Sequence, residues 1–283
     1  MKDWDIEELI DLLGRCGAIA LEYYDDPPCE FKKDHSVVTA ADKAIEKMLG
    51  EHFDRPDEGV YMIGEETSSS RDENYIKSAL EGTAWVIDPI DGTAPYSNHV
   101  PLWGISIAMM KKSVILEGAI FLPPTGELFI TDGDKVFYAV AERRGNSWDF
   151  SSLAPLIPRK RPLDDGALIS VSQKITKEGK FLGYNPVLSL CCCVYSMSYL
   201  VVGRLLAYVG TVKIWDIAAG LAIVSKCGFA ARLATGEDLT MEVNERFYDL
   251  SPGSKKRWSL HGHCVVAPDD KTIDYVFSKL ELP

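Results

Sequence analysis

The sequence is short of basic residues, has no long apolar run and has no cysteine pair at metal-binding spacing. Its 283 residues carry 30 Lys and Arg against 42 Asp and Glu, a formal net charge of −12. This balance disfavours binding to nucleic-acid phosphates, which needs basic stripes. No apolar stretch approaches the ~20 residues of a membrane-spanning helix. No Cys-x-x-Cys occurs, which argues against a zinc site.

Seven cysteines are present, three of them adjacent at Cys191, Cys192 and Cys193. Consecutive helical residues point in different directions, so these three do not form a shared metal site. The cysteine count is odd, and the N-terminal segment lacks the apolar core of a signal peptide. We therefore expect reduced thiols, buried as small apolar residues, in a cytoplasmic protein. No chemical role is assigned to the three adjacent cysteines.

Hydrophobic periodicity divides the chain into a strand-rich half, residues 1–150, and a half in which strands alternate with helices, residues 151–283. A chain of this length can form one extended domain or two intimate ones. Helices are expected over 4–24, 39–53, 188–202, 216–226 and 271–280. An antiparallel meander is expected over 104–110, 115–121, 127–131 and 135–140. Further strands are expected over 167–171, 205–209, 230–233 and 263–267, after a connector over 147–165.

The segment Trp85-Val86-Ile87-Asp88-Pro89-Ile90-Asp91-Gly92-Thr93 is the most informative part of the sequence. Its apolar start predicts a buried strand, which we expect Pro89 to end because proline has no N–H for the ladder. Asp88 and Asp91 can then face one point, and carboxylate oxygens are the ligands that Mg²⁺ prefers. Gly92 permits close backbone approach, and the amides of a following helix suit an anion. This is the layout of phosphoryl chemistry, although Asp-x-x-Asp is also typical of an ordinary capped turn.

Other segments also place carboxylates at the edges of regular elements. Gly64-Glu65-Glu66 follows an apolar strand. Asp216 follows a tryptophan at the start of an apolar, small-residue helix. Thr39 and Asp42 precede an amphipathic helix, where they also fit an N-cap and a first-turn acid. No single segment is specific for one kind of site, but the occurrence of all of them in this order along the chain is.

In this order the motifs resemble those of the inositol monophosphatase family of Mg²⁺-dependent, lithium-sensitive phosphomonoesterases. The matching strings are Gly64-Glu65-Glu66, Asp88-Pro89-Ile90-Asp91-Gly92-Thr93 and Trp215-Asp216-x-Ala218-Ala219-Gly220. The resemblance spans essentially the whole chain. It implies an α/β fold with an α+β N-terminal half, layered as an α-β-α-β-α sandwich. It also implies an enzyme, a metal-dependent phosphoric monoester hydrolase that activates water with two magnesium ions.

The resemblance assigns metal-binding roles to residues of this sequence. Asp88 would bridge two magnesium ions. Glu65 and the Ile90 carbonyl would hold the first ion, and a third ion is an open option. Asp91 and Asp216 would hold the second. Such a cluster of acids cannot stay ionised without cations, so we expect raised carboxylate pKa values.

The resemblance also implies catalytic roles for Thr93, Asp42 and Glu65. The Thr93 hydroxyl would orient the attacking water, and Asp42 would polarise that hydroxyl. Substrate contacts are implied for Gly92, Thr93 and Asp216, with the amides of Gly92 and Thr93 holding the phosphate.

Three more residues are candidates for support around the site. Glu66 is either a ligand of a third ion or an acid next to the ligands. Lys32 is a candidate for the pocket mouth, although lysines at such places are more often solvated. Thr39 is a candidate because its spacing from Asp42 fits a capping pair.

Departures from the family pattern bear on the substrate. Val209 stands seven residues before Asp216, where the family places a glutamate that binds inositol hydroxyls. The segment 188–193 replaces Gly-Ser-Ala with bulkier, more apolar residues. Both changes argue against inositol phosphate as the preferred substrate. The string over 32–42 resembles bacterial 3′-phosphoadenosine phosphatases and histidinol phosphatases, and Pro101-Leu102-Trp103 is similar to the latter.

Three functions are left open. The first is hydrolysis of a small phosphomonoester. The second keeps the same site but acts as a 3′(2′),5′-bisphosphate nucleotidase or a histidinol-phosphatase. The third is non-catalytic binding of metal and phosphate, which the complete ligand set disfavours. The family resemblance predicts a homodimer, and neither a nucleic-acid polymer nor a membrane is expected as a partner.

Overall fold

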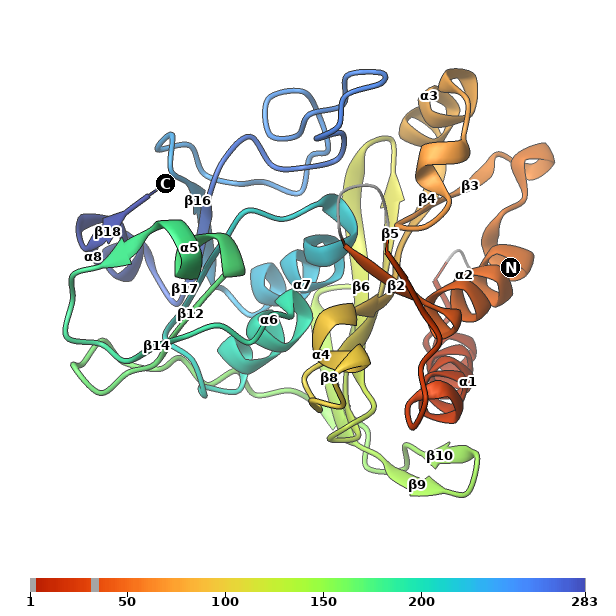
Figure 1. Cartoon of the computed structure of the whole chain (residues 1–283), viewed down its shortest axis with the longest axis horizontal. Helices are drawn as coiled ribbons and strands as arrows, with labels where there is room; N and C mark the ends of the chain where they lie inside the picture. Colours follow the sequence, from red (N-terminus) through yellow and green to blue (C-terminus); the bar gives the residue numbers. More distant parts are fainter. Residues whose placement is uncertain (1–3, 32–35, 283) are drawn as a thin grey trace.

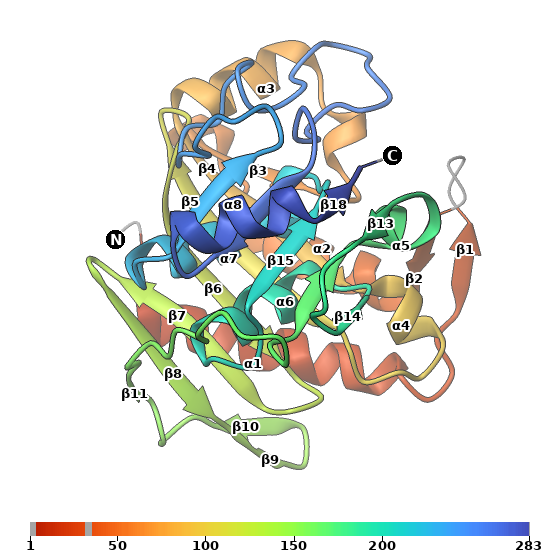
Figure 2. The same ribbon diagram turned by 90° about the vertical axis from the view of Figure 1, so that its left-hand side faces the viewer.

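The computed structural model describes residues 4–31 and 36–282, and these form five layers (Figure 1). The helices α1 (Ile6–Tyr23) and α2 (Ala40–Phe53) cover the outer face of a seven-stranded sheet. The helices α6 (Cys193–Val201) and α7 (Ile214–Lys226) lie between this sheet and a five-stranded one. The helices α5 (Gln173–Glu178) and α8 (Asp270–Ser278) cover the far face of the second sheet, the face seen in Figure 2. The expected α-β-α-β-α sandwich is confirmed.

The first sheet contains the meander that the sequence predicts. Its strands are β3 (Val60–Gly64), β4 (Thr83–Asp91), β5 (Gly104–Lys111), β6 (Val114–Leu122), β7 (Glu127–Asp132), β8 (Lys135–Val140) and β11 (Ala154–Pro155). Their order is β11-β8-β7-β6-β5-β4-β3, with β3 parallel to β4 and the other neighbours antiparallel. β4 and β5 are buried along almost their whole length because helices cover both faces. Their sequences are therefore apolar runs rather than alternating patterns.

Local sequence explains where the outer helices begin. Asp5 caps α1 by accepting hydrogen bonds from the N–H groups of Glu7 and Glu8. Thr39 and Asp42 form a capping box at the start of α2. The apolar faces of both helices pack on β4 to β8 in one buried cluster, so α2 is fixed directly above the sheet that carries the Asp88 segment.

The middle helices are apolar on all sides because both of their faces are covered. Nearly every residue of α6 and α7 is buried. A Cβ on Gly118 of β6 would stand 2.5 Å from the Ala219 carbonyl oxygen of α7. A Cβ on Gly220 would stand 2.7 Å from Met197 Cγ of α6. The buried cluster around these helices joins residues from both sides of position 150, and a domain division there stays a prediction.

The second sheet has the strand order β14-β12-β15-β17-β16. Its strands are β12 (Ile169–Val171), β14 (Val187–Leu188), β15 (Ala207–Gly210), β16 (Ala230–Leu233) and β17 (Cys264–Ala267). β12 is parallel to β14 and β15, whereas β17 is antiparallel to β15 and β16. Strands and helices alternate here, as the sequence predicts.

Short elements complete the described chain. They are α3 (Glu73–Glu81), α4 (Thr93–Ser97), the 3₁₀ turns Pro56–Glu58 and Ser68–Ser70, β1 (Cys29–Phe31), β2 (Val37–Thr39), β9 (Glu142–Arg144), β10 (Ser147–Asp149), β13 (Lys180–Phe181) and β18 (Leu280–Glu281). β1 pairs with β2, β9 with β10 and β13 with β18. Within 4–31 and 36–282, no helix combines the length and the apolar character needed to cross a membrane.

Three expectations about elements are corrected. The helix expected over 188–202 begins only at Cys193, because Leu188 pairs with the second sheet and Cys191 has a φ of 55°. Pro89 interrupts β4 but does not end it, since pairing with β5 resumes at Asp91. The connector expected over 147–165 contains the short strands β10 and β11.

All seven cysteines are free thiols, which agrees with the expectation. Five are buried as small apolar residues: Cys16, Cys192, Cys193, Cys227 and Cys264. Cys29 and Cys191 are exposed, so the expectation of buried thiols is wrong for these two.

Candidate active site

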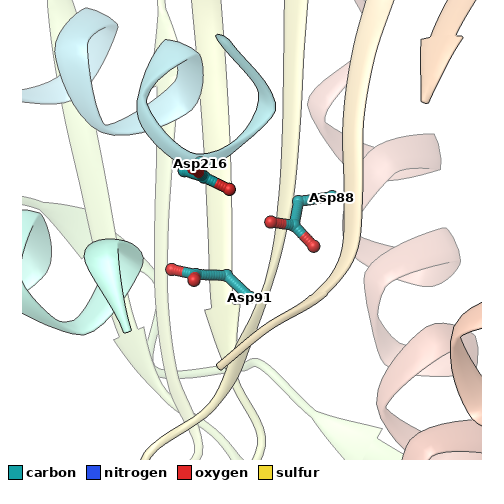
Figure 3. A group of neighbouring side chains, drawn as sticks. All are labelled: Asp88, Asp91 and Asp216. Atoms are coloured by element: carbon teal, nitrogen blue, oxygen red, sulfur yellow. The ribbon is translucent and has the colours of Figure 1, made fainter. Parts of the chain in front are cut away.

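Three carboxylates converge where β4 ends and α7 begins. Asp88, Asp91 and Asp216 each offer an oxygen that lies within 4.8 Å of the other two. Figure 3 shows the three side chains grouped together, two of them coming from the β4 segment and the third from the start of α7. Carboxylate oxygens gathered in this way can hold a divalent cation.

A β-bulge puts the two β4 carboxylates on one face of the sheet. Residues three apart on a regular strand point to opposite faces. In β4, Pro89 and Ile90 together oppose a single residue of β5. The extra residue brings Asp91 back to the face that Asp88 occupies. Proline suits the bulge because no ladder N–H is needed there.

Asp91 is held by the start of α6. Its Oδ2 atom accepts hydrogen bonds from the Val194 N–H at 2.6 Å and from the Cys192 thiol at 3.3 Å. The next residue, Gly92, has a φ of 89°, and a Cβ there would stand 2.7 Å from the Leu102 carbonyl oxygen. Glycine is therefore required where the chain turns from β4 into α4.

Asp216 is oriented by its own helix. Its Oδ2 atom accepts a hydrogen bond of 2.8 Å from the Lys213 N–H, which is part of the capping box of α7. Trp215 is buried in the core between the sheets. The tryptophan thus anchors the first turn of α7 and leaves the carboxylate of Asp216 facing β4.

The electrostatics of the three acids fit a bound cation. Both side-chain oxygens of Asp88 are buried and have no hydrogen-bond partner among the described residues. Burial, followed by the charges of neighbouring acids, raises the pKa of Asp88 well above its ordinary value. The pKa values of Asp91 and Asp216 are raised mainly by burial as well. An unpartnered, buried carboxylate among other acids is what a divalent ion would satisfy.

Glu65 and Glu66 follow β3 beside the end of β4, and both are partly buried. The Glu65 N–H donates to the Ile87 carbonyl at 3.2 Å. The charge of Glu65 helps to raise the pKa values of Asp88 and Asp216. Glu65 therefore acts on the same site, although its carboxylate stands outside the group of three described above.

The structure places Thr93 and Asp42 in different hydrogen bonds. The Thr93 hydroxyl donates to the Ile90 carbonyl at 3.1 Å. Asp42 Oδ2 accepts from the N–H of Thr39 at 2.8 Å and from its hydroxyl at 2.5 Å. Asp42 Oδ1 is buried with no hydrogen-bond partner in the described part of the chain. Burial is the main cause that raises the pKa of Asp42 to about 7.

A cavity of about 170 Å³ lies beside Asp91 and Asp216. It is also lined by Val171, Ser172, Gln173, Cys191, Cys192, Cys193, Ser196, Tyr208 and Val212. Sequence reasoning missed Ser172 and Gln173, whose one signal was a polar pair directly after the apolar strand 167–171. Val209 is buried in the core of the second sheet, and Lys32 lies outside the described residues.

Known proteins resemble the chain along most of its length. Residues 5–268 match the model of the inositol monophosphatase family. A histidinol-phosphatase of Chlorobaculum parvum is 28% identical over 242 residues, which cover 79% of this chain and 83% of that protein. An inositol-1-monophosphatase of Bacillus subtilis is 24% identical over 234 residues, covering 78% and 82%.

Solved structures share the fold. The Thermotoga maritima IMPase aligns with a TM-score of 0.66 at 20% identity, covering 96% of this chain and 95% of that one. An IMPase/NADP phosphatase complexed with Mg²⁺ and phosphate aligns with a TM-score of 0.68 at 15% identity, covering 96% and 94%. With the family model matched from the first helix to β17, the chain belongs to the inositol monophosphatase family and is a phosphatase of phosphomonoesters.

Proposed function

We propose that the protein hydrolyses a small phosphomonoester in a Mg²⁺-dependent reaction. The observation that carries this proposal is the convergence of Asp88, Asp91 and Asp216, with both Asp88 oxygens buried and without a hydrogen-bond partner in the described chain. Such a group is unfavourable unless a cation satisfies it.

The residues that would hold the ions come from three elements. Asp88 would be shared between two ions, with Glu65 and the Ile90 carbonyl on the first. Asp91 and Asp216 would complete the second, and Glu66 is the candidate ligand if a third ion binds. Bound Mg²⁺ would neutralise phosphate charge and lower the pKa of a coordinated water.

Thr93 and Asp42 would position the attacking water. The Thr93 hydroxyl donates to the Ile90 carbonyl and retains two lone pairs that can accept a hydrogen bond from water. Asp42, held by Thr39, presents an unpartnered oxygen from the start of α2. A water held in this geometry is already oriented for attack. Such orientation before the reaction is one source of the rate enhancement of enzymes.

The phosphate would lie at the start of α4. The first-turn N–H groups of a helix have no intrahelical acceptor, so the amides of Gly92 and Thr93 suit an anion. Asp216, at the cavity side of the site, would contact the leaving group.

Two features, one in the second sheet and one in the cavity wall, bear on the leaving group. Val209, which replaces the hydroxyl-binding glutamate of the family, is fully buried in the second sheet. The cavity wall at Cys191, Cys192 and Cys193 has side chains with no polar group other than their thiols. Both features favour a leaving group other than inositol. A histidinol-phosphatase among the relatives makes histidinol phosphate the first alternative, followed by a 3′(2′),5′-bisphosphate nucleotide.

Phosphate release from a panel of monoesters tests the proposal. The panel holds inositol 1-phosphate, histidinol phosphate, 3′-phosphoadenosine 5′-phosphate, fructose 1,6-bisphosphate and NADP, each with Mg²⁺ and with EDTA. One substrate turned over far faster than the rest, only with Mg²⁺, is the expected result. Metal binding without turnover of any substrate would support the non-catalytic reading instead. Turnover that persists in EDTA would contradict the role of the three acids.

Lithium sensitivity, a homodimer and a cytoplasmic location stay predictions from the family resemblance. Lithium inhibition measured at several Mg²⁺ concentrations, and the mass of the protein in solution, test the first two.

A further inference from the structure

A carboxylate that belongs to none of the motifs lies under the Glu65 segment. Glu46 is on α2, one helical turn after Asp42, and only 1% of the residue is exposed. Its side chain points away from solvent although no cation is paired with it among the described residues. Buried carboxylates of this kind need several hydrogen bonds to be stable.

Glu46 accepts three hydrogen bonds from the chain that follows Glu65. Its Oε2 atom accepts from the Glu66 N–H at 2.9 Å. Its Oε1 atom accepts from the Thr67 N–H at 2.8 Å and from the Thr67 hydroxyl at 2.6 Å. Both oxygens are thus used, and every donor lies within two residues of Glu65.

Gly64 makes room for this carboxylate. A Cβ on Gly64 would stand 2.3 Å from Glu46 Oε1 and 2.6 Å from its carboxyl carbon. These atoms cannot move away without giving up the hydrogen bonds to Thr67. The glycine before the two acids is therefore explained by contact with Glu46, because any side chain would push α2 and the Glu65 segment apart.

The Glu65 backbone is consequently held on two sides. Its own N–H donates to the Ile87 carbonyl of β4, and the following N–H, that of Glu66, donates to Glu46. Together these bonds fix where the residue stands relative to Asp88. We propose that Glu46 is a positioning residue that holds Glu65 in place for the cation and thereby sets the Mg²⁺ affinity of the site. This inference rests on the proposed function for the identity of the ion.

The substitution Glu46→Gln separates positioning from simple packing. Glutamine has nearly the same volume, but its amide has one accepting oxygen where the carboxylate has two. Either the Glu66 N–H or the Thr67 N–H then faces an NH₂ group and loses its bond. Substitution of a group that orients a metal ligand, without touching the metal itself, typically lowers metal affinity 10- to 100-fold.

Metal binding by the 283-residue chain is the readout, measured by calorimetric titration with Mg²⁺ in the absence of substrate. Glu127→Gln is the matched control, because Glu127, in β7 of the first sheet, is also buried but pairs with Arg204 and Tyr138. We expect Glu46→Gln to raise the Mg²⁺ dissociation constant about 10-fold or more. Turnover at saturating Mg²⁺ should stay within a few-fold of the wild type, and Glu127→Gln should bind Mg²⁺ normally.

A folded Glu46→Gln protein with wild-type Mg²⁺ affinity overturns the inference, as does an equal loss in Glu127→Gln. If wild-type protein binds Mg²⁺ but hydrolyses no phosphate ester, the proposed function fails while the affinity comparison still decides the role of Glu46. If wild-type protein binds no Mg²⁺, both proposals fail.

Gly64→Ala gives a second test that does not depend on the glutamine variant folding well. The added methyl group should weaken Mg²⁺ binding when Glu46 is present. In a Glu46→Ala background, the same change meets no carboxylate and should add little. Fully additive losses in the double variant would show that Gly64 and Glu46 act independently and would contradict the inference.

Discussion

Without Mg²⁺, the protein should become less stable as the pH rises, and Mg²⁺ should remove part of that loss. Asp42, Asp88, Asp91 and Asp216 all have raised pKa values, in each case chiefly through burial. An acid whose pKa is higher in the folded than in the unfolded protein binds its proton more tightly when folded. The stability of the metal-free protein therefore falls as the pH rises from the unfolded pKa toward the folded one.

The size of the effect follows from Asp42. Its pKa rises from 3.8 to about 7, and one pKa unit corresponds to about 1.4 kcal/mol. This residue alone thus lowers the free energy of unfolding by about 4 kcal/mol between about pH 4 and pH 8. For a chain of this size that is a fall of about 8 °C in Tm. Glu46, whose pKa is also raised chiefly by burial, adds to the fall, whereas His263 acts in the opposite direction because burial lowers its pKa.

Thermal unfolding followed by circular dichroism, from about pH 5 to about pH 8 in EDTA and in Mg²⁺, measures this. Mg²⁺ at 100 times its dissociation constant should add about 2.7 kcal/mol at the upper pH, and much less at the lower pH where protons compete. In EDTA, Asp88→Asn should flatten the fall with pH, and it should abolish the Mg²⁺ effect. A Tm in EDTA that is constant or rises with pH would refute the reasoning, as would an Mg²⁺ effect independent of pH.

Other predictions concern single residues of the site. Asp91→Asn should abolish hydrolysis in a steady-state assay while circular dichroism stays unchanged, because an amide oxygen can still accept from Val194; retained turnover would contradict the metal assignment. Thr93→Ala should lower turnover by roughly 10²-fold without changing Mg²⁺ affinity, and an unchanged rate would reduce Thr93 to a turn residue. Iodoacetamide should modify the exposed Cys191 far faster than the buried Cys192, which mass spectrometry can show. The group added to Cys191 should block the cavity and lower activity. Full activity after complete modification would place Cys191 away from the substrate.

Residue patterns alone were sufficient for the meander and for the alternation of strands and helices after it, whereas the five layers were implied by the family resemblance. The meander and the capped start of α2 follow from turn residues, apolar runs and the spacing of Thr39 and Asp42. These are local signals, and the structure retains them. The convergence of Asp88 with Asp216 is not local, and only the resemblance to a known family suggested it.

Two features could not be read from the sequence, for different reasons. An apolar run such as 188–202 suits either a buried strand or a helix, and pairing of Leu188 with β12 decided the matter. Glu46 looks like a solvated position on an amphipathic helix. It is buried because the chain after Gly64 turns over it, which is a contact between segments about 20 residues apart.

The carboxylate of Asp91 joins parts of the chain that lie 103 positions apart, since its Oδ2 accepts from the Val194 N–H. The same bond ties a candidate cation ligand to the segment whose cysteines wall the cavity. If, as proposed, the ion binds at Asp91 and the leaving group enters this cavity, the bond offers a route by which the two binding events are coupled, and such coupling is reciprocal. A leaving group that reshapes the wall at Cys191 to Cys193 would then alter the affinity for the ion by the same factor as the ion alters the affinity for it. Selection on substrate preference in this chain would then act on its metal requirement as well.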